Sequence, residues 1–362
     1  MRRALELAAR GLYTTSPNPR VGCVLVRDGR VVGEGWHEKA GGLHAEAHAL
    51  EAAGRLAPDA ARGATAYVTL EPCNHHGRTP PCVDALIRAD VARVVAALRD
   101  PNPEAARGGE RLAAAGIRFE HGLLEDEARE LNIGFVSRMT RGRPWVRMKI
   151  AASLDGRTAL ANGQSQWITG AEARADGHRW RARACALLTG IGTLKADDPQ
   201  LNVREVQTTR QPLRVIVDSR METPPGAKIL SGGGGVLLFA GAENAAARAA
   251  LEARGAEVLV LPNAGGKVEL PAMLAELGRR GINELHVEAG VKLNGSLLRE
   301  GCVDEFLIYL APSLLGDAAQ GMVALALDAL EARVSLQWQS VERVGADLRI
   351  LARPATTTKG ND

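Results

Sequence analysis

The sequence predicts an α/β protein built from two successive domains. Short β-branched, apolar segments alternate with Ala-, Leu- and Glu-rich helical segments in both halves, which is typical of helix-covered sheets with some parallel pairing. The length of 362 residues is also long for one domain. The run 138–144 (RMTRGRP) is basic, polar and ends in proline, so we place the boundary there, with domains at 1–143 and 144–362.

In the first half, an amphipathic helix at the amino terminus precedes a hairpin whose turn is the Asp28-Gly29 pair. Pro80 and Pro81 are suited to the first turn of a later helix. The elements that follow the hairpin are expected to be helix 44–54, strand 64–70, helix 80–89, strand 92–98, helix 108–115, a short strand near Ile117 and helix 124–139.

The second half is again α/β, without an internal repeat of the first. The expected order is strand 145–153, helix 171–183, strand 185–190, a glycine-containing turn at 191–204, strand 213–219, and then alternating strands and helices up to strand 304–312. The glycine run at 231–235 precedes a strand, so it is a weak dinucleotide-binding signal. HVEAG (286–290) instead ends a strand and enters a helix, where backbone amides could hold a phosphate.

Composition limits the classes of function. The net charge of +3 is too weak to indicate a nucleic-acid partner. The five cysteines are irregularly spaced, which argues against a disulfide framework and for a reducing compartment; Cys23, Cys185 and Cys302 lie in apolar runs and are expected in the core. No run approaches the ~20 apolar residues that span a bilayer, and we expect a cytoplasmic protein.

The segment from His44 to Cys82 carries the strongest chemical signal. One imidazole and two thiolates, from His44, Cys73 and Cys82, form a zinc ligand set that leaves a fourth position open for water. Such a water would have its pKa lowered to about 7, giving hydroxide that could attack an amino-bearing ring carbon. Glu46 is placed to transfer the protons, as in zinc nucleobase deaminases, although eight residues rather than two separate these cysteines.

Alternatives to this site remain open from the residues alone. A closed, structural zinc site could use His75 or His76 as fourth ligand, and His48 could form an i, i+4 metal-binding pair with the first histidine. Asn18 lies in a polar, proline-rich segment and could either reach a ring edge in the zinc pocket or stabilise a turn.

Motifs from both halves together resemble the bifunctional riboflavin-biosynthesis family that joins a diaminohydroxyphosphoribosylaminopyrimidine deaminase to a 5-amino-6-(5-phosphoribosylamino)uracil reductase. They are TSPNPRVGCV, GLHAEAHAL, VTLEPCNHHGRTPPC and RDPNP, followed by MKIAASLDGRTAL, SQWITG, ADDPQLNVR, VDS and HVEAG. The GRTPP insertion between the cysteines separates this family from tRNA and cytidine deaminases. The resemblance covers nearly the whole chain and implies a cytidine-deaminase-like domain followed by a dihydrofolate-reductase-like domain that binds NADPH.

The same resemblance implies the two reactions. The first is zinc-dependent deamination of 2,5-diamino-6-ribosylamino-4(3H)-pyrimidinone 5′-phosphate, with His44, Cys73 and Cys82 as zinc ligands and Glu46 as proton shuttle. The second is NADPH-dependent reduction of the ribosyl group of 5-amino-6-(5-phosphoribosylamino)uracil to ribityl.

Motif matching also implies the binding residues of the second domain. Cofactor contacts are expected at Ala151, Ser165, Trp167, Thr193, Asp197 and Gly290. Substrate contacts are expected at Ser165, Arg181, Leu201, Arg204 and Glu288, together with Lys149 and, in the first domain, Asn18. The arginines fit substrates that carry a 5′-phosphate, because guanidinium groups bind phosphate with two charge-assisted hydrogen bonds.

Two other functions compete with this interpretation. One is a single-activity nucleobase deaminase whose second domain binds without catalysing, and the other is a structural-zinc protein that senses a nucleotide. In the favoured interpretation the partners are small pyrimidine ribotides, with no nucleic acid and no membrane, and the chain forms a homo-oligomer.

Overall fold

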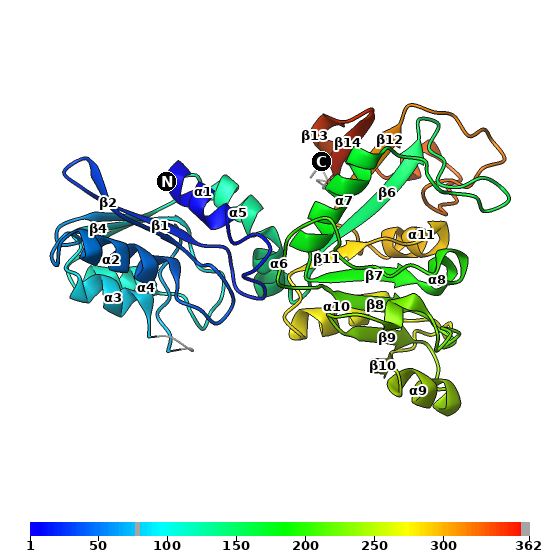
Figure 1. Ribbon diagram of the computed structural model, residues 1–362, viewed down its shortest axis with the longest axis horizontal. Coiled ribbons are helices and arrows are strands. Elements are labelled where there is room, and N and C mark those ends of the chain that lie inside the picture. Colours follow the sequence, from blue (N-terminus) through cyan, green and yellow to red (C-terminus); the bar gives the residue numbers. More distant parts are fainter. Residues whose placement is uncertain (77–79, 356–362) are drawn as a thin grey trace, which may run out of the picture. The chain divides into compact units, whose positions relative to one another are not determined.

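The computed structural model describes residues 1–76 and 80–355. Figure 1 shows the path of the chain as a ribbon. The chain forms two compact units, Met1–Gly142 and Arg143–Asp362. Residues 77–79, within the GRTPP insertion, lie outside the described residues. None of the helices in the described ranges is long and apolar enough to cross a membrane.

In its described residues, the first unit is built on a five-stranded sheet in the order β2-β1-β3-β4-β5, with β3, β4 and β5 parallel and β1 antiparallel to both neighbours. The strands are β1 Gly22–Arg27, β2 Arg30–Trp36, β3 Thr65–Leu70, β4 Arg93–Leu98 and β5 Arg118–His121. The helices are α1 Arg2–Ala9, α2 Ala45–Leu56, α3 Cys82–Arg88, α4 Gly108–Ala114, α5 Glu125–Leu131 and α6 Ile133–Arg141.

Helix α2 packs closely on this sheet, which fixes the position of its first turn. Its buried face is made of alanines, including Ala45 and Ala49, which belong to one core cluster with Cys23 of β1. A Cβ atom at Gly35 of β2 would lie 2.5 Å from the Ala45 carbonyl oxygen, so only glycine allows this approach. The small residues therefore hold the amino end of α2, with His44 and Glu46, against the sheet.

The prediction of one helix over 124–139 is wrong, because the segment forms two helices that meet at Asn132. This side chain is buried and bonds to the backbone of Arg20 through two 2.8 Å hydrogen bonds, accepting from its N–H and donating to its carbonyl. The long-range contact turns the chain between α5 and α6 and anchors the segment that carries Asn18.

The second unit contains, within its described residues, a nine-stranded sheet in the order β10-β9-β8-β7-β11-β6-β12-β14-β13. Neighbours from β10 to β12 are parallel, and β14 and β13 add an antiparallel hairpin at one edge. The strands are β6 Trp145–Ser153, β7 Ala186–Gly190, β8 Leu213–Val217, β9 Val236–Ala240, β10 Ala256–Val260, β11 Glu284–Val287, β12 Glu305–Ala311, β13 Leu336–Val344 and β14 Asp347–Pro354.

The helices of this unit are α7 Ala171–Arg183, α8 Ile191–Asp197, α9 Ala245–Glu252, α10 Leu270–Arg279 and α11 Val291–Arg299, with short 3₁₀ turns η1 Lys228–Leu230 and η2 Leu330–Ala332. The expected α/β class is confirmed, and Cys23, Cys185 and Cys302 are buried as predicted. Two features differ from expectation: the predicted turn at 191–204 begins with helix α8, and the hairpin β13–β14 was not predicted.

A buried ion-pair network joins the amino ends of the central strands. The Arg147 side chain, 1% exposed, lies 3.0 Å from a Glu284 carboxylate oxygen and 2.5 Å from one of Glu305. Arg183 of α7 pairs with Glu284 at 2.7 Å, and Arg353 of β14 pairs with Glu305 at 3.0 Å. The network therefore connects α7 and β14 to the core of the sheet. It lies at the amino ends of the central strands, away from their carboxyl ends.

We expect Arg147→Ala to destabilise the second unit by about 3 kcal/mol or more, because it leaves two buried carboxylates with one partner fewer each. Urea unfolding followed by tryptophan fluorescence measures the change. The control is Arg220→Ala, which removes an ion pair from an 83% exposed side chain; it should change little. Equal stability of the two variants would contradict the role given to the network.

Candidate active sites

Three ligand-type side chains converge at the carboxyl end of β3. His44 is the N-cap of α2, Cys73 follows β3, and Cys82 is the first residue of α3. The His44 Nδ1 atom lies 3.2 Å from the Cys82 sulfur and 3.5 Å from the Cys73 sulfur, and all three ligand atoms lie within 4.8 Å of one another.

These distances fit a tetrahedral zinc ion. Zn–N and Zn–S bonds of about 2.0 and 2.3 Å at a tetrahedral angle separate nitrogen from sulfur by about 3.5 Å. The hydrogen bond from the Cys82 thiol, opposed by burial and aided by His44, lowers the pKa of Cys73 to about 4. The deprotonated, thiolate form of Cys73 is thus favoured, and this is the form that binds a metal ion.

Glu46 lies beside this cluster in the first turn of α2 and is 3% exposed. Burial, together with the nearby charge of Cys73, raises the pKa of its carboxyl to about 6. A carboxyl that exchanges a proton near neutral pH is suited to general acid–base work.

Among the described residues, the metal-type cluster contains His44, Cys73 and Cys82 alone, without His48, His75 or His76. The described residues therefore give no support to a closed four-ligand site or to the i, i+4 histidine pair.

Asn18 is held next to the cluster by His37. The His37 Nδ1–H donates to the Leu43 carbonyl at 2.9 Å, so its Nε2 atom accepts from the Asn18 amide at 3.1 Å. The His37 ring also packs edge-on against the ring of His44, with centroids 5.4 Å apart. This arrangement points the side-chain nitrogen of Asn18 at His37. It leaves the side-chain oxygen of Asn18 to accept a hydrogen bond from another donor.

Two acids near the cluster were missed by sequence reasoning. Glu71 is buried and accepts hydrogen bonds from the backbone N–H groups of Asp100, at 3.2 Å, and Gly109, at 2.8 Å. Burial, together with the charges of Glu71, Cys73 and Glu46, raises the pKa of Asp100 to about 7. Both follow the carboxyl ends of adjacent parallel strands, which is the signal that could have identified them.

In the second unit, Glu288 is the centre of a charged cluster directly after β11. Arg181 of α7 donates two hydrogen bonds to its carboxylate, at 2.5 and 2.8 Å, and the Lys149 ammonium of β6 lies 4.0 Å away. Burial would raise the pKa of Glu288, but Arg181 and Lys149 outweigh it and hold the pKa well below its usual value. Three predicted substrate residues are thus brought together.

The predicted cofactor residues are only partly brought together. A Cβ atom at Gly290, the N-cap of α11, would lie 3.5 Å from the Thr193 hydroxyl, so the starts of α8 and α11 are adjacent. Asp197 ends α8 and is exposed, whereas Ala151 lies on β6, opposite Tyr309 of β12.

Ser165 and Trp167 lie in the loop before α7. The Trp167 side chain is largely exposed, and the Arg174 guanidinium stacks over its ring at 4.6 Å. In the described part of the chain, no hydrogen bond or ion pair joins either residue to the Glu288 cluster.

Leu201 and Arg204 follow α8. The Leu201 side chain is buried in a hydrophobic cluster, with a positive φ of 45°, so its side chain is not free to contact a ligand. The Arg204 guanidinium donates to the Asn202 side-chain oxygen at 2.6 Å, and the Asn202 carbonyl accepts from Arg181 at 3.3 Å. Arg204 therefore reaches the Glu288 cluster through its neighbour.

Comparison with known families matches both units. The family model described as the RibD C-terminal domain matches residues 144–350. The model described as the cytidine and deoxycytidylate deaminase zinc-binding region matches residues 1–98.

Full-length relatives are similar over nearly the whole chain. The riboflavin biosynthesis protein RibD of Escherichia coli (strain K12) is 47% identical, over 96% of each chain, and that of Aquifex aeolicus is 42% identical, over 97% of this chain and 96% of the relative. Among solved structures, Acinetobacter baumannii RibD superposes with a TM-score of 0.90 at 44% identity, covering 98% of this chain and 97% of the other. The deaminase/reductase of Thermotoga maritima gives 0.87 at 34% identity, with the same coverage.

His178 of α7 makes the second unit sensitive to acid. Its Nδ1 atom accepts a hydrogen bond from the Arg204 backbone N–H at 3.4 Å, which requires a neutral ring. Burial, and then the charges of Arg181 and Arg204, lower the pKa of His178 to about 4. Between about pH 6.5 and 4 the unfolded chain therefore binds more protons than the folded one, and stability falls as the pH falls.

We expect the free energy of unfolding of this unit to decrease over that window, and to decrease less in His178→Gln. Urea unfolding at a series of pH values measures both curves. Identical pH dependence in the two proteins would contradict this assignment.

Proposed function

The chain belongs to the RibD family of bifunctional riboflavin-biosynthesis proteins, and from this premise we propose which residues carry its two reactions. The protein is a zinc-dependent deaminase and an NADPH-dependent reductase. It removes the amino group of 2,5-diamino-6-ribosylamino-4(3H)-pyrimidinone 5′-phosphate and then reduces the ribosyl group of 5-amino-6-(5-phosphoribosylamino)uracil to ribityl. We place the division between the two activities at residues 143 and 144.

For the deaminase, we assign His44, Cys73 and Cys82 as zinc ligands. The observation that carries this assignment is the convergence of one nitrogen and two sulfur atoms at zinc-like separations. When bound, zinc supplies the Lewis acidity that lowers the pKa of a water molecule.

Glu46 is the proton carrier of this reaction in our proposal. Its carboxyl is buried beside the ligands, and burial raises its pKa to about 6. It can therefore carry one proton from water to the ring nitrogen and a second, from the hydroxyl group added to the ring carbon, to the amino group that leaves as ammonia. Asn18, oriented by His37, offers its side-chain oxygen to a donor on the pyrimidine ring.

For the reductase, we assign Lys149, Arg181 and Glu288 to the pyrimidine ribotide. The Glu288 carboxylate stays ionised because of its two cationic neighbours, and it can accept hydrogen bonds from ring N–H groups. Ser165, Leu201 and Arg204 complete the proposed substrate contacts, with Leu201 offering only its backbone.

NADPH supplies a hydride when bound, and we propose that the starts of α8 and α11 receive its phosphates. The N-terminus of α11 follows Gly290, where backbone N–H groups and the helix dipole favour anions. The remaining proposed cofactor contacts are Ala151, Ser165, Trp167, Thr193 and Asp197.

We further infer that the protein acts on small ribotides without nucleic acid, as a homo-oligomer, in the cytoplasm. The five free cysteines of the chain support a reducing compartment. A single-activity deaminase with a binding domain is not favoured, because the reductase family model matches residues 144–350.

We expect Glu46→Gln to retain about one zinc ion per chain while ammonia release slows by roughly 10²- to 10⁴-fold, because the amide keeps the shape but cannot carry a proton. Metal analysis and an ammonia assay with the aminated ribotide measure the two effects. The control is Glu51→Gln, a change in the same helix on its exposed side. A Glu46→Gln protein that deaminates at the wild-type rate would refute the proton-carrier role.

We expect NADPH oxidation to require the deaminated ribotide. Glu46→Gln protein supplied with the aminated ribotide should oxidise NADPH no faster than it releases ammonia, and the same protein supplied with the deaminated ribotide should oxidise it at the wild-type rate. Absorbance at the nicotinamide band, with mass spectrometry of the products, gives the rates. Equal oxidation of both ribotides by the Glu46→Gln protein would contradict the order of the two steps.

A further inference from the structure

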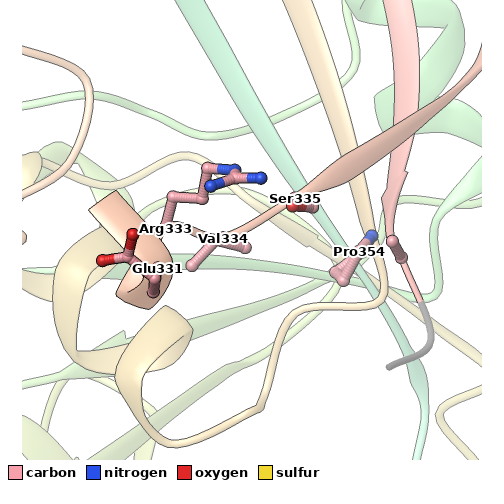
Figure 2. A pocket seen from close by; sticks show the side chains of 6 residues that line it. Glu331, Arg333, Val334, Ser335 and Pro354 are labelled. Atoms are coloured by element: carbon pink, nitrogen blue, oxygen red, sulfur yellow. The ribbon is translucent and has the colours of Figure 1, made fainter. Parts of the chain in front are cut away.

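The pocket shown in Figure 2 has a volume of about 440 Å³ and lies beside the start of β13. Its lining residues are Glu331, Arg333, Val334, Ser335, Pro354 and Ala355, and none of them is among the proposed substrate or cofactor contacts. A buried polar group behind Glu288, by contrast, lies directly against a proposed substrate residue. This group is the imidazole of His286, and no assignment above uses it.

The His286 side chain lies between two charged clusters on one face of the sheet. Side chains two positions apart in a strand project from the same face, so Glu284, His286 and Glu288 share the face that α7 covers. In the register of the sheet, His286 pairs with Arg147 of β6. The imidazole is 0% exposed and thus stands between the buried Arg147 network and the Glu288 cluster.

The imidazole of His286 is neutral and carries its proton on Nε2. Burial lowers the pKa of His286, the charges of Arg147 and Arg181 act in the same direction, and Glu288 opposes them only in part. A neutral imidazole has one N–H donor and one acceptor nitrogen. The Nε2 atom lies 3.4 Å from Oε1 of Glu288, an ionised carboxylate oxygen that can only accept. Because a lone pair on Nε2 would face that negative charge, the proton belongs on Nε2.

This buried donor has one acceptor within reach. In the described part of the chain, neither ring nitrogen of His286 has an aligned hydrogen-bond partner, and the carboxylate of Glu288 is the charged group nearest to Nε2. A buried donor without a partner lowers stability, so such a group calls for an explanation. Hydrogen bonds in active sites are often long before the substrate binds and shorten when it does.

The two oxygens of the Glu288 carboxylate differ in how many donors they face. Oε1 accepts from the Arg181 Nε atom at 2.5 Å and also faces His286, so both of its lone pairs are used once that bond forms. Oε2 accepts from Arg181 Nη2 at 2.8 Å, whereas the Lys149 ammonium, at 4.0 Å, is beyond hydrogen-bond distance. One lone pair of Oε2 therefore remains for a ring N–H group.

We propose that His286 is a positioning residue of the reductase, whose Nε2–H group donates to Oε1 of Glu288 and turns the remaining lone pair of Oε2 toward the pyrimidine ring. The proposal rests on the assignment of Glu288 to the ribotide and adds the residue that fixes this carboxylate from its buried side. Because the imidazole is fully buried, it acts through Glu288 and touches no substrate. Loss of the donor should weaken ribotide binding and leave hydride transfer and NADPH binding unchanged.

Steady-state reductase kinetics with the deaminated ribotide test this role, because that substrate bypasses the zinc site. We expect His286→Leu, which removes the donor at similar volume, to raise the KM for the ribotide roughly tenfold and to change kcat by less than about twofold. His286→Gln keeps an N–H donor and should bring this KM to within about threefold of the wild-type value. The KM for NADPH should stay at its wild-type value in both variants and is the internal control.

A wild-type ribotide KM in His286→Leu, or an equally raised KM in His286→Gln, would overturn the proposal. Glu288→Gln distinguishes this failure from a failure of the substrate assignment. If Glu288→Gln raises the ribotide KM and His286→Leu does not, only the positioning role is lost. If Glu288→Gln leaves the KM unchanged, the assignment of Glu288 fails and the positioning role fails with it.

Nitrogen NMR of protein labelled at histidine observes the hydrogen bond directly, and it carries the proposal should His286→Leu fail to fold. The signal of His286 is the one missing from the His286→Gln protein, whose folding circular dichroism verifies. We expect a proton coupled to Nε2 and none coupled to Nδ1, and a downfield shift of that proton when the deaminated ribotide is added without NADPH. A proton on Nδ1, or a signal that the ribotide leaves in place, would overturn the proposal.

Discussion

The first active site depends on bringing one imidazole nitrogen and two sulfur atoms to a single point. The three residues come from the start of α2, the end of β3 and the start of α3, so the constraint involves much of the first unit. Close packing of α2 on the sheet, through its alanines and Gly35, holds the imidazole in place. The parallel pairing of β3 and β4 brings the loop of Asp100 to the same edge, where Glu71 anchors it through two backbone N–H groups.

In the second unit, charged side chains instead of metal ligands converge on one point. Glu288 is partly buried, yet it stays ionised because Arg181 and Lys149 converge on it from a helix and a neighbouring strand. At the opposite ends of the strands, the Arg147 network joins α7 to the sheet. One end of α7 is thus fixed by buried ion pairs, which limits the movement of the arginine that faces the carboxylate.

Most strands of both sheets could be predicted from sequence because they are short apolar runs between clear helices. The zinc cluster could be predicted because residue chemistry and spacing together limit it to few possibilities. The reductase contacts could not, since Arg181 and Glu288 are 107 positions apart and only the resemblance to a family connected them. The hairpin β13–β14 escaped prediction because β13 is exposed along most of its length and lacks the alternation of a half-buried strand.

The hydrogen bonds between Asn132 and Arg20 have a consequence for how the protein is made. They join positions 112 residues apart, so during synthesis the backbone of Arg20 lacks these two hydrogen bonds until Asn132 has left the ribosome. The nascent chain can form the hairpin β1–β2 early, but it can complete the region beside the zinc cluster only when translation has entered the second unit. A ribosome that pauses before that point would hold a first unit in which the segment of Asn18 is not yet anchored to Asn132.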